Sequence, residues 1–151
     1  MRIDVADPTA PALRALLDEH LQHMRAVTPL ESVHALGPAA LRHSDITFWS
    51  AWDGDLLVGC AALKELDAAH GEVKSMRTPA ALRRRGAGRA LLAHLLQVAR
   101  SRGYERLSLE TGAAPAFLPA RRLYESAGFA YCGPFATYVA DPNSVFMTRT
   151  L

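Results

Sequence analysis

Arg83-Arg84-Arg85-Gly86-Ala87-Gly88-Arg89 places four arginines and two glycines within seven residues. Directly after this turn, apolar residues recur at helical spacing as far as Ser101, and Gly103 predicts the end of that helix. A helix start carries about half a positive charge and unpaired N–H groups, so each cation near it costs about 0.3–1 kcal/mol. The arginines are therefore best explained by an anion on the turn, which Gly86 and Gly88 allow backbone N–H groups to approach.

Other interpretations of the arginine cluster are a solvated surface patch and a nucleic-acid contact. A nucleic-acid site needs a broader basic face with aromatic or base-reading side chains, and none interleave here. The whole chain, with 17 basic and 15 acidic residues, has a net charge of only +2. The Walker pattern is absent, and Leu91 stands where a dinucleotide-binding turn needs its third glycine. A phosphate ligand of another kind is the favoured prediction.

The segments around the turn predict a mixed sheet. Before it, strand-like runs at 46–52 and 56–66 flank the hairpin signal Asp53-Gly54, and a third run at 72–78 follows a predicted turn at His70-Gly71. The remaining predicted elements are a strand at 2–5, a helix for which Asp7-Pro8-Thr9 offers capping residues, a strand at 106–110, a helix at 119–127, and strands at 129–132 and 144–150. A strand, the long helix and another strand in succession imply one parallel pair.

We therefore predict an α/β fold with a mostly antiparallel sheet, flanking helices and one central parallel strand pair. With 151 residues, half of them hydrophobic and 21% charged, the chain should form a single domain over 1–151 and bury roughly two-thirds of its surface. The charged start at 1–7 and the lack of a long apolar run predict no signal peptide or membrane span. Cys60 and Cys132 are expected to be buried, reduced thiols of a cytoplasmic protein.

Two motifs resemble those of one family. Arg83, Gly86 and Gly88 form the pattern R-x-x-G-x-G, and Ala120-Arg121-Arg122-Leu123-Tyr124-Glu125-Ser126-Ala127-Gly128-Phe129 fits A-x-x-L-Y-x-x-x-G-F. Both are similar to signatures of the GNAT superfamily, the acetyl-CoA-dependent N-acetyltransferases. The order of predicted elements agrees from Ile46 to Phe129. The chain is therefore identified as resembling a small bacterial single-domain member.

The resemblance implies acetyl-CoA as the acyl donor, without a metal. Its pyrophosphate is expected on the arginine turn, and Arg84, Arg85 or Arg89 would reach the 3′-phosphate. Backbone groups of the third strand run would hold the pantetheine arm. The implied cofactor-binding residues are Met76, Arg77, Thr78, Arg83, Arg84, Arg85, Gly86, Ala87, Gly88 and Arg89. His20 and His23 stand at i, i+3 spacing with no third ligand, so no metal site is predicted.

Acetyl transfer to an amine needs one group that takes a proton and one that gives a proton. Glu72 is the predicted base, acting through water, because it begins a strand run eleven residues before Arg83, as in several superfamily members. Alternation predicts Lys74, Met76 and Thr78 on the same face. Glu65 and Glu110 are the alternative carboxylates.

Tyr124 is the predicted acid, because it matches the family tyrosine that faces the CoA sulfur and a phenol keeps its proton at neutral pH. The alternative is a packing role with its hydroxyl already bonded. Many relatives have Asn at the position of Phe117, which leaves the contacts around Tyr124 open.

The predicted function is acetyl transfer from acetyl-CoA to a primary amine of a small molecule or peptide, by direct attack. The alternative is a non-catalytic acyl-CoA-binding or sensing module on the same fold. The predicted partners are the CoA thioester and an amine, with no nucleic acid or membrane, and an exposed final strand would allow a homodimer.

Overall fold

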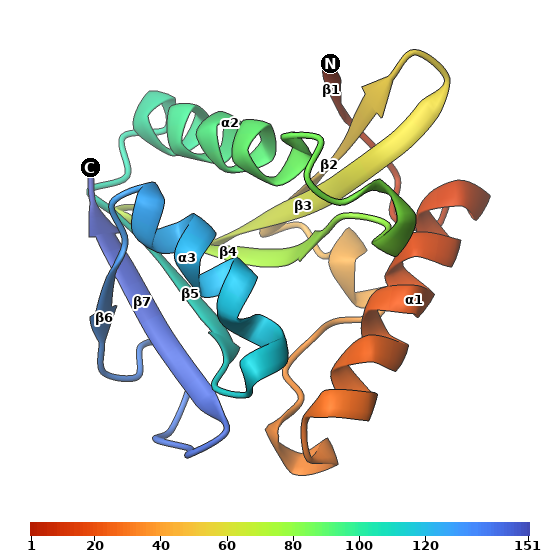
Figure 1. The fold of residues 1–151 in the computed structure, drawn as a ribbon. Helices are drawn as coiled ribbons and strands as arrows, with labels where there is room; N and C mark the ends of the chain where they lie inside the picture. The colour runs from red at the N-terminus through yellow and green to blue at the C-terminus, as the bar shows by residue number, and fades with distance from the viewer.

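Seven strands form one sheet in the order β1-β2-β3-β4-β5-β7-β6 in the computed structural model, which describes residues 1–151 (Figure 1). The strands are β1 (Arg2–Val5), β2 (Ile46–Asp53), β3 (Leu56–Asp67), β4 (His70–Arg77), β5 (Arg106–Gly112), β6 (Ala130–Cys132) and β7 (Ser144–Thr150). The helices are α1 (Pro11–Val27), α2 (Ala87–Ser101) and α3 (Leu118–Ser126), with short 3₁₀ turns at Leu30–Ser32, Ala40–Arg42, Ala80–Leu82 and Pro115–Phe117. Only β4 and β5 pair in parallel, so the predicted fold class is confirmed.

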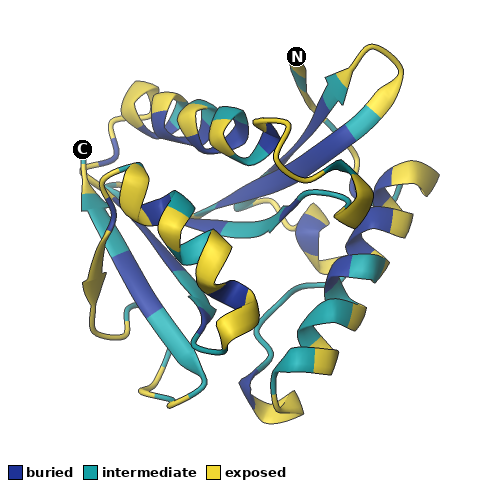
Figure 2. Cartoon of the chain, in the orientation of Figure 1, coloured by how far each residue is buried: buried dark blue, intermediate teal, exposed yellow.

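Alternation along the strands separates the interior into two cores. The central strands between them carry buried residues (Figure 2). On β2, Trp49 belongs to the larger core beneath α2 and α3, whereas its neighbour Phe48 belongs to the smaller core beneath α1. The apolar stripe of α1 supplies Leu13, Leu16 and Leu17 to the smaller core. The two faces of the sheet are therefore covered by different helices, α1 on one face and α2 and α3 on the other.

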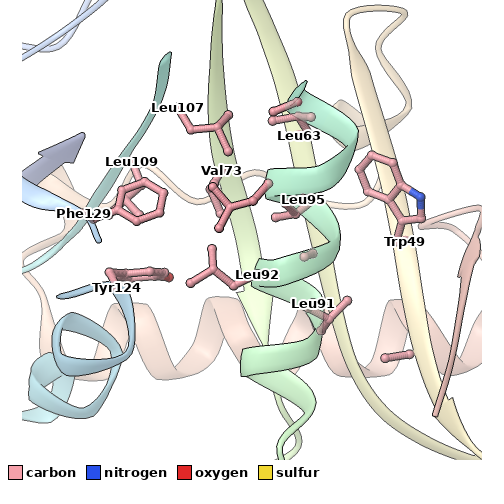
Figure 3. Packing of buried hydrophobic residues seen from close by; sticks show 14 of the residues in the cluster. Trp49, Leu63, Val73, Leu91, Leu92, Leu95, Leu107, Leu109, Tyr124 and Phe129 are labelled. Carbon is pink, nitrogen blue, oxygen red and sulfur yellow. The ribbon is translucent and has the colours of Figure 1, made fainter. Parts of the chain in front are cut away.

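The stripe predicted on α2 fills the larger core. Leu91, Leu92 and Leu95 are at most 1% exposed, and Figure 3 shows them between strand residues and the side chain of Tyr124 on α3. Tyr124 also packs edge-on against Phe129, with ring centroids 6.1 Å apart. The second motif thus joins α3 to the main core through its tyrosine and its phenylalanine.

Two local predictions are wrong. The turn between β3 and β4 lies at Ala68 and Ala69, not at His70-Gly71. Gly71 lies within β4, where the Tyr104 ring comes so close to its backbone that a Cβ there would lie 2.8 Å from that ring. At α1, the N-cap is Ala10 without a side-chain bond, because Asp7 instead accepts hydrogen bonds from the backbone and hydroxyl of Thr9.

The edges of the sheet also differ from expectation. The final strand β7 lies between β5 and β6, so the exposed edge on that side is β6. Cys60 is buried as predicted, but Cys132 lies on β6 and is exposed. No helix of this chain has both the length and the apolar character that a membrane crossing requires.

We expect Gly112→Ala to destabilise the fold, because a Cβ at the end of β5 would lie only 2.1 Å from the ring of Phe117. Displacing that buried ring should lower the free energy of unfolding by about 1–3 kcal/mol, measured by denaturant titration. Gly133→Ala is the matched control, because no atom would lie within 4 Å of its Cβ. Equal unfolding midpoints for the two variants would contradict this close approach.

Candidate active site

The parallel pair β4–β5 separates partway along its length. Its register ends at Val73 opposite Leu109, although β4 continues to Arg77 and β5 to Gly112. Beyond this point β4 pairs only with β3, and β5 pairs only with β7. The strands therefore diverge, and residues 74–77 of β4 have a backbone edge without a strand partner.

A bulge in β4 changes which side chains face the gap. Ala62 pairs with Lys74 but Cys60 pairs with Arg77, so β4 contains one extra residue there, and Ser75 has a φ of 51°. The extra residue inverts the alternation. Lys74 stays on the face of Glu72, but Met76 points to the opposite face and packs against the larger core. The prediction that Lys74, Met76 and Thr78 share the face of Glu72 is therefore wrong beyond Lys74.

The bulge also returns Arg77 to the α1 face, where its guanidinium donates to Glu19 at 2.9 Å. The side chain of Arg77 is therefore used to hold α1 against the end of β4. Its backbone remains beside the gap.

A large cavity of about 730 Å³ lies on the side of α2 and α3, and we call it the arginine cavity. It is lined by nine of the ten residues predicted to bind a cofactor: Met76, Arg77, Thr78, Arg83, Arg84, Gly86, Ala87, Gly88 and Arg89. The exception is Arg85, which is absent from the lining and lies 4.0 Å from Asp53. The turn therefore supplies three arginines to one cavity.

The geometry of the turn suits an anion. Gly86 is the N-cap of α2 with a φ of 83°, a conformation that glycine adopts without strain. No side chain caps this helix start and its first turn has no acidic residue, so its N–H groups and the guanidinium groups of Arg83, Arg84 and Arg89 lack an acidic partner. The arginine cavity can therefore hold a polyanion.

A smaller cavity of about 110 Å³ contains the charged residues of the opposite side, and we call it the carboxylate cavity. Its lining includes Glu72, Lys74, Glu110 and Tyr138. The two cavities share the side chains at the gap: His20, Met24, Met76, Phe117, Ala120 and Tyr124. A molecule that extends from the arginine cavity through the gap would therefore meet one that occupies the carboxylate cavity.

Tyr124 lies where the two cavities meet. Its hydroxyl is 3.8 Å from the sulfur of Met76, and the residue is only 8% exposed. Burial raises the pKa of its phenol to about 12, and the charge of Glu110 adds to the increase. Tyr124 is therefore protonated at neutral pH and can donate a proton.

Glu72 lies in a buried network. Its Oε2 accepts hydrogen bonds from Tyr138 Oη at 2.6 Å and from Lys74 Nζ at 3.2 Å. Lys74 also donates to Tyr138 at 3.1 Å. Burial, together with the negative charge of Glu72, raises the pKa of Tyr138 well above its usual range. The predicted base is thus in the cavity, but it already has two donors.

The two alternative carboxylates lie in different places. Glu110, on β5, lines the carboxylate cavity, and burial raises the pKa of its carboxyl to about 7. Glu65 accepts a hydrogen bond from Tyr104 at 2.8 Å and lines neither cavity. Of the two alternative carboxylates, only Glu110 therefore lies in the same cavity as Glu72.

Sequence reasoning missed one residue of the site and assigned no role there to two others. Tyr138 comes from the irregular segment 133–143, which carries no motif, so nothing in the sequence signalled it. His20 lies on the predicted buried stripe of α1, and burial lowers its pKa to about 4, so it is neutral in the cavity wall. Phe117, at the position where Asn is usual, packs on Gly112 and lines both cavities.

Residues 11–129 match the family model described as acetyltransferase (GNAT) family. The chain belongs to the GNAT family of acetyltransferases. It is 57% identical over 151 residues, all of both chains, to a Bacillus subtilis (strain 168) protein named uncharacterized N-acetyltransferase YsnE. The GNAT fold and the names of such relatives support acyltransferase activity.

Solved GNAT structures have the same architecture. A protein from Klebsiella pneumoniae described as a putative acyl-CoA N-acyltransferase matches with a TM-score of 0.79 at 29% identity, over 99% of this chain and 97% of that one. A GNAT acetyltransferase from Elizabethkingia anophelis, with acetyl-CoA bound, matches with a TM-score of 0.72 at 16% identity, over 99% of this chain and 97% of that one. The second match concerns the fold alone.

Proposed function

We propose that this protein transfers an acetyl group from acetyl-CoA to a primary amine of a small molecule or peptide. The observation that supports this most directly is the pair of cavities that meet at Tyr124 through the gap between β4 and β5. One side offers positive charge and helix N–H groups to a diphosphate, and the other offers carboxylates to an ammonium.

The donor would occupy the arginine cavity. Arg83, Arg84 and Arg89, with the N–H groups that follow Gly86, would hold its phosphates. The pantetheine amides would pair with the free backbone edge of residues 74–77, in the manner of an added strand. This contact would use backbone groups, so it does not depend on which face the bulge turns the side chains to. The bulge leaves the β4 edge at residues 74–77 without a strand partner. Arg85, predicted from the sequence as a further ligand, lies outside the cavity lining and would contribute little.

The transfer would proceed by direct attack of the amine on the thioester carbon. A carboxylate of the carboxylate cavity takes a proton from the acceptor ammonium. Glu72, acting through water, is the sequence-based choice for this role, and Glu110 is the other carboxylate in the lining. Backbone N–H groups of the open β4 edge would stabilise the oxyanion. Tyr124 protonates the departing thiolate. The small volume of the carboxylate cavity favours a compact amine-bearing group.

The experiment that tests the function is thiol release from acetyl-CoA over a panel of amino acids, polyamines, aminoglycosides and peptides. We expect turnover with a subset of these amines. CoA binding without thiol release from any of them would instead support a non-catalytic acyl-CoA-binding module.

Arg89→Ala should weaken CoA binding about tenfold, because it removes a guanidinium that lines the arginine cavity while alanine keeps α2 helical. The measurement is calorimetric titration with CoA. Arg85→Ala is the matched control, since it removes one arginine of the same turn whose side chain lies outside the lining. Equal losses in the two variants would show that overall charge, and not this cavity, determines affinity.

Tyr124→Phe should lower the turnover number about 100-fold with the best amine of the panel, because it removes the proton donor and keeps the buried ring. The dissociation constant for CoA should stay within about twofold of the wild-type value, since no phosphate contact changes. Undiminished turnover in this variant would exclude Tyr124 as the acid.

A further inference from the structure

Glu110 holds a distinctive position in the gap. The β4–β5 register pairs Glu72 with Ser108 and Val73 with Leu109, and then ends. Glu110 is therefore the first residue of β5 beyond the pairing, and it shares the face of Ser108. It lines the carboxylate cavity at the point where the two strands begin to diverge.

Glu72 is poorly placed to receive a proton. Its Oε2 is bonded to a partly buried ammonium and to a partly buried phenol, and the Glu72 side chain itself is only 4% exposed. Protonating Glu72 would leave Lys74 as a buried cation without its partner, which is costly. The Glu72–Lys74–Tyr138 network is therefore suited to positioning.

Glu110 lacks such constraints. No ammonium or phenol donates to its carboxylate; its one donor is the Ser144 hydroxyl, which has no other partner, and burial outweighs the lowering of the Glu110 pKa that this contact causes. A desolvated carboxyl without firm donors holds a proton more readily than a paired one. Its pKa of about 7 agrees with this setting and matches the ideal for a base that works at neutral pH.

We propose that Glu110 binds the ammonium of the acceptor and takes its proton, while Glu72, Lys74 and Tyr138 position the acceptor opposite Tyr124. This inference rests on the proposed function and identifies the acceptor as a compact amine that binds as a cation. One ammonium proton passes to Glu110. The neutral nitrogen then attacks the thioester carbon, and the C–N bond forms.

Collapse of the tetrahedral intermediate breaks the C–S bond. The thiolate takes the proton of Tyr124, and the tyrosinate takes the remaining excess proton from the nitrogen. Glu110 finally releases its proton to solvent. The products are the acetylated amine, CoA thiol and one proton, so atoms and charge balance.

The charges around Glu110 favour a cationic acceptor. From β4 it faces the negative Glu72 and the positive Lys74, and from the segment 133–143 the negative Asp141 and the neutral Tyr138. Tyr124 on α3 is neutral, and His20 on α1 is neutral because burial lowers its pKa to about 4. His34 lines the cavity from the segment after α1. Counting Glu110 itself, one cation therefore stands against three carboxylates, and a bound ammonium reduces this excess of negative charge.

The test compares Glu110→Gln with Glu72→Gln in thiol release from acetyl-CoA. The amines are n-butylamine, putrescine, glycine and lysine, and hydroxylamine serves as a nucleophile that is already neutral at pH 7. Glu65→Gln is the matched control, because that carboxylate lies outside both cavities. Calorimetry with CoA, run on every variant, reports donor binding separately.

Glu110 must be ionised to act, so wild-type kcat/KM should rise with pH through about 7. We expect Glu110→Gln to lower kcat with the cationic amines about 100-fold and to remove this rise. Transfer to hydroxylamine and CoA affinity should stay within a few-fold. Glu72→Gln should raise KM and keep the rise. If Glu110→Gln does not fold, two other measurements test the role of Glu110. Glu110→Asp should keep the rise of kcat/KM with pH at a lower kcat. Carboxyl-carbon NMR of the wild type should show a glutamate titrating near pH 7.

An unchanged pH profile in Glu110→Gln, or its loss in Glu72→Gln alone, would overturn the assignment. A wild-type protein that binds CoA but acetylates none of the five nucleophiles and no amine of the wider panel would contradict the proposed function itself, and the role of Glu110 with it. The two failures are distinguishable, because the first leaves wild-type turnover intact.

Discussion

The site depends on the parallel pair β4–β5 separating after Val73 and Leu109. Each strand keeps its outer partner, β3 for β4 and β7 for β5, so the separation does not break the sheet as a whole. The seven β5–β7 pairs extend to Gly112, well past the last β4–β5 pair. Both strands that border the gap are therefore fixed by pairing with their outer neighbours, β4 with β3 and β5 with β7.

This gap connects two electrostatic environments of opposite character. On the helix side, Arg83, Arg84 and Arg89 gather at the electropositive start of α2. On the other side, Glu72 and Glu110 outnumber Lys74. The net charge of the whole chain is only +2, so the two cavities differ because positive and negative side chains are segregated and not because the chain has a large excess of either. In the proposed function, an anionic donor and a cationic acceptor approach from opposite faces and meet beside Tyr124.

The fold and the arginine turn before α2 could be predicted because their signals are local. The arginine turn, the helix after it and the strands at 46–52, 56–66 and 106–110 each depend on near neighbours in sequence, and each was found. The carboxylate cavity depends on contacts between distant segments. Tyr138 reaches Glu72 from 66 residues away, and no short pattern marks that approach. The bulge at Ser75 was missed because a single extra residue leaves the sequence alternation intact while inverting the faces beyond it.

The central claim is that the open edge of β4 accepts the pantetheine arm, and amide hydrogen exchange tests it most directly. With saturating acetyl-CoA, we expect at least one free-edge amide in residues 74–77 to exchange about tenfold more slowly, as a new hydrogen bond requires. Val73, already paired with Leu109, should be unchanged. Slower exchange confined to the turn at 86–89, with none in 74–77, would show that the donor binds there without entering the gap.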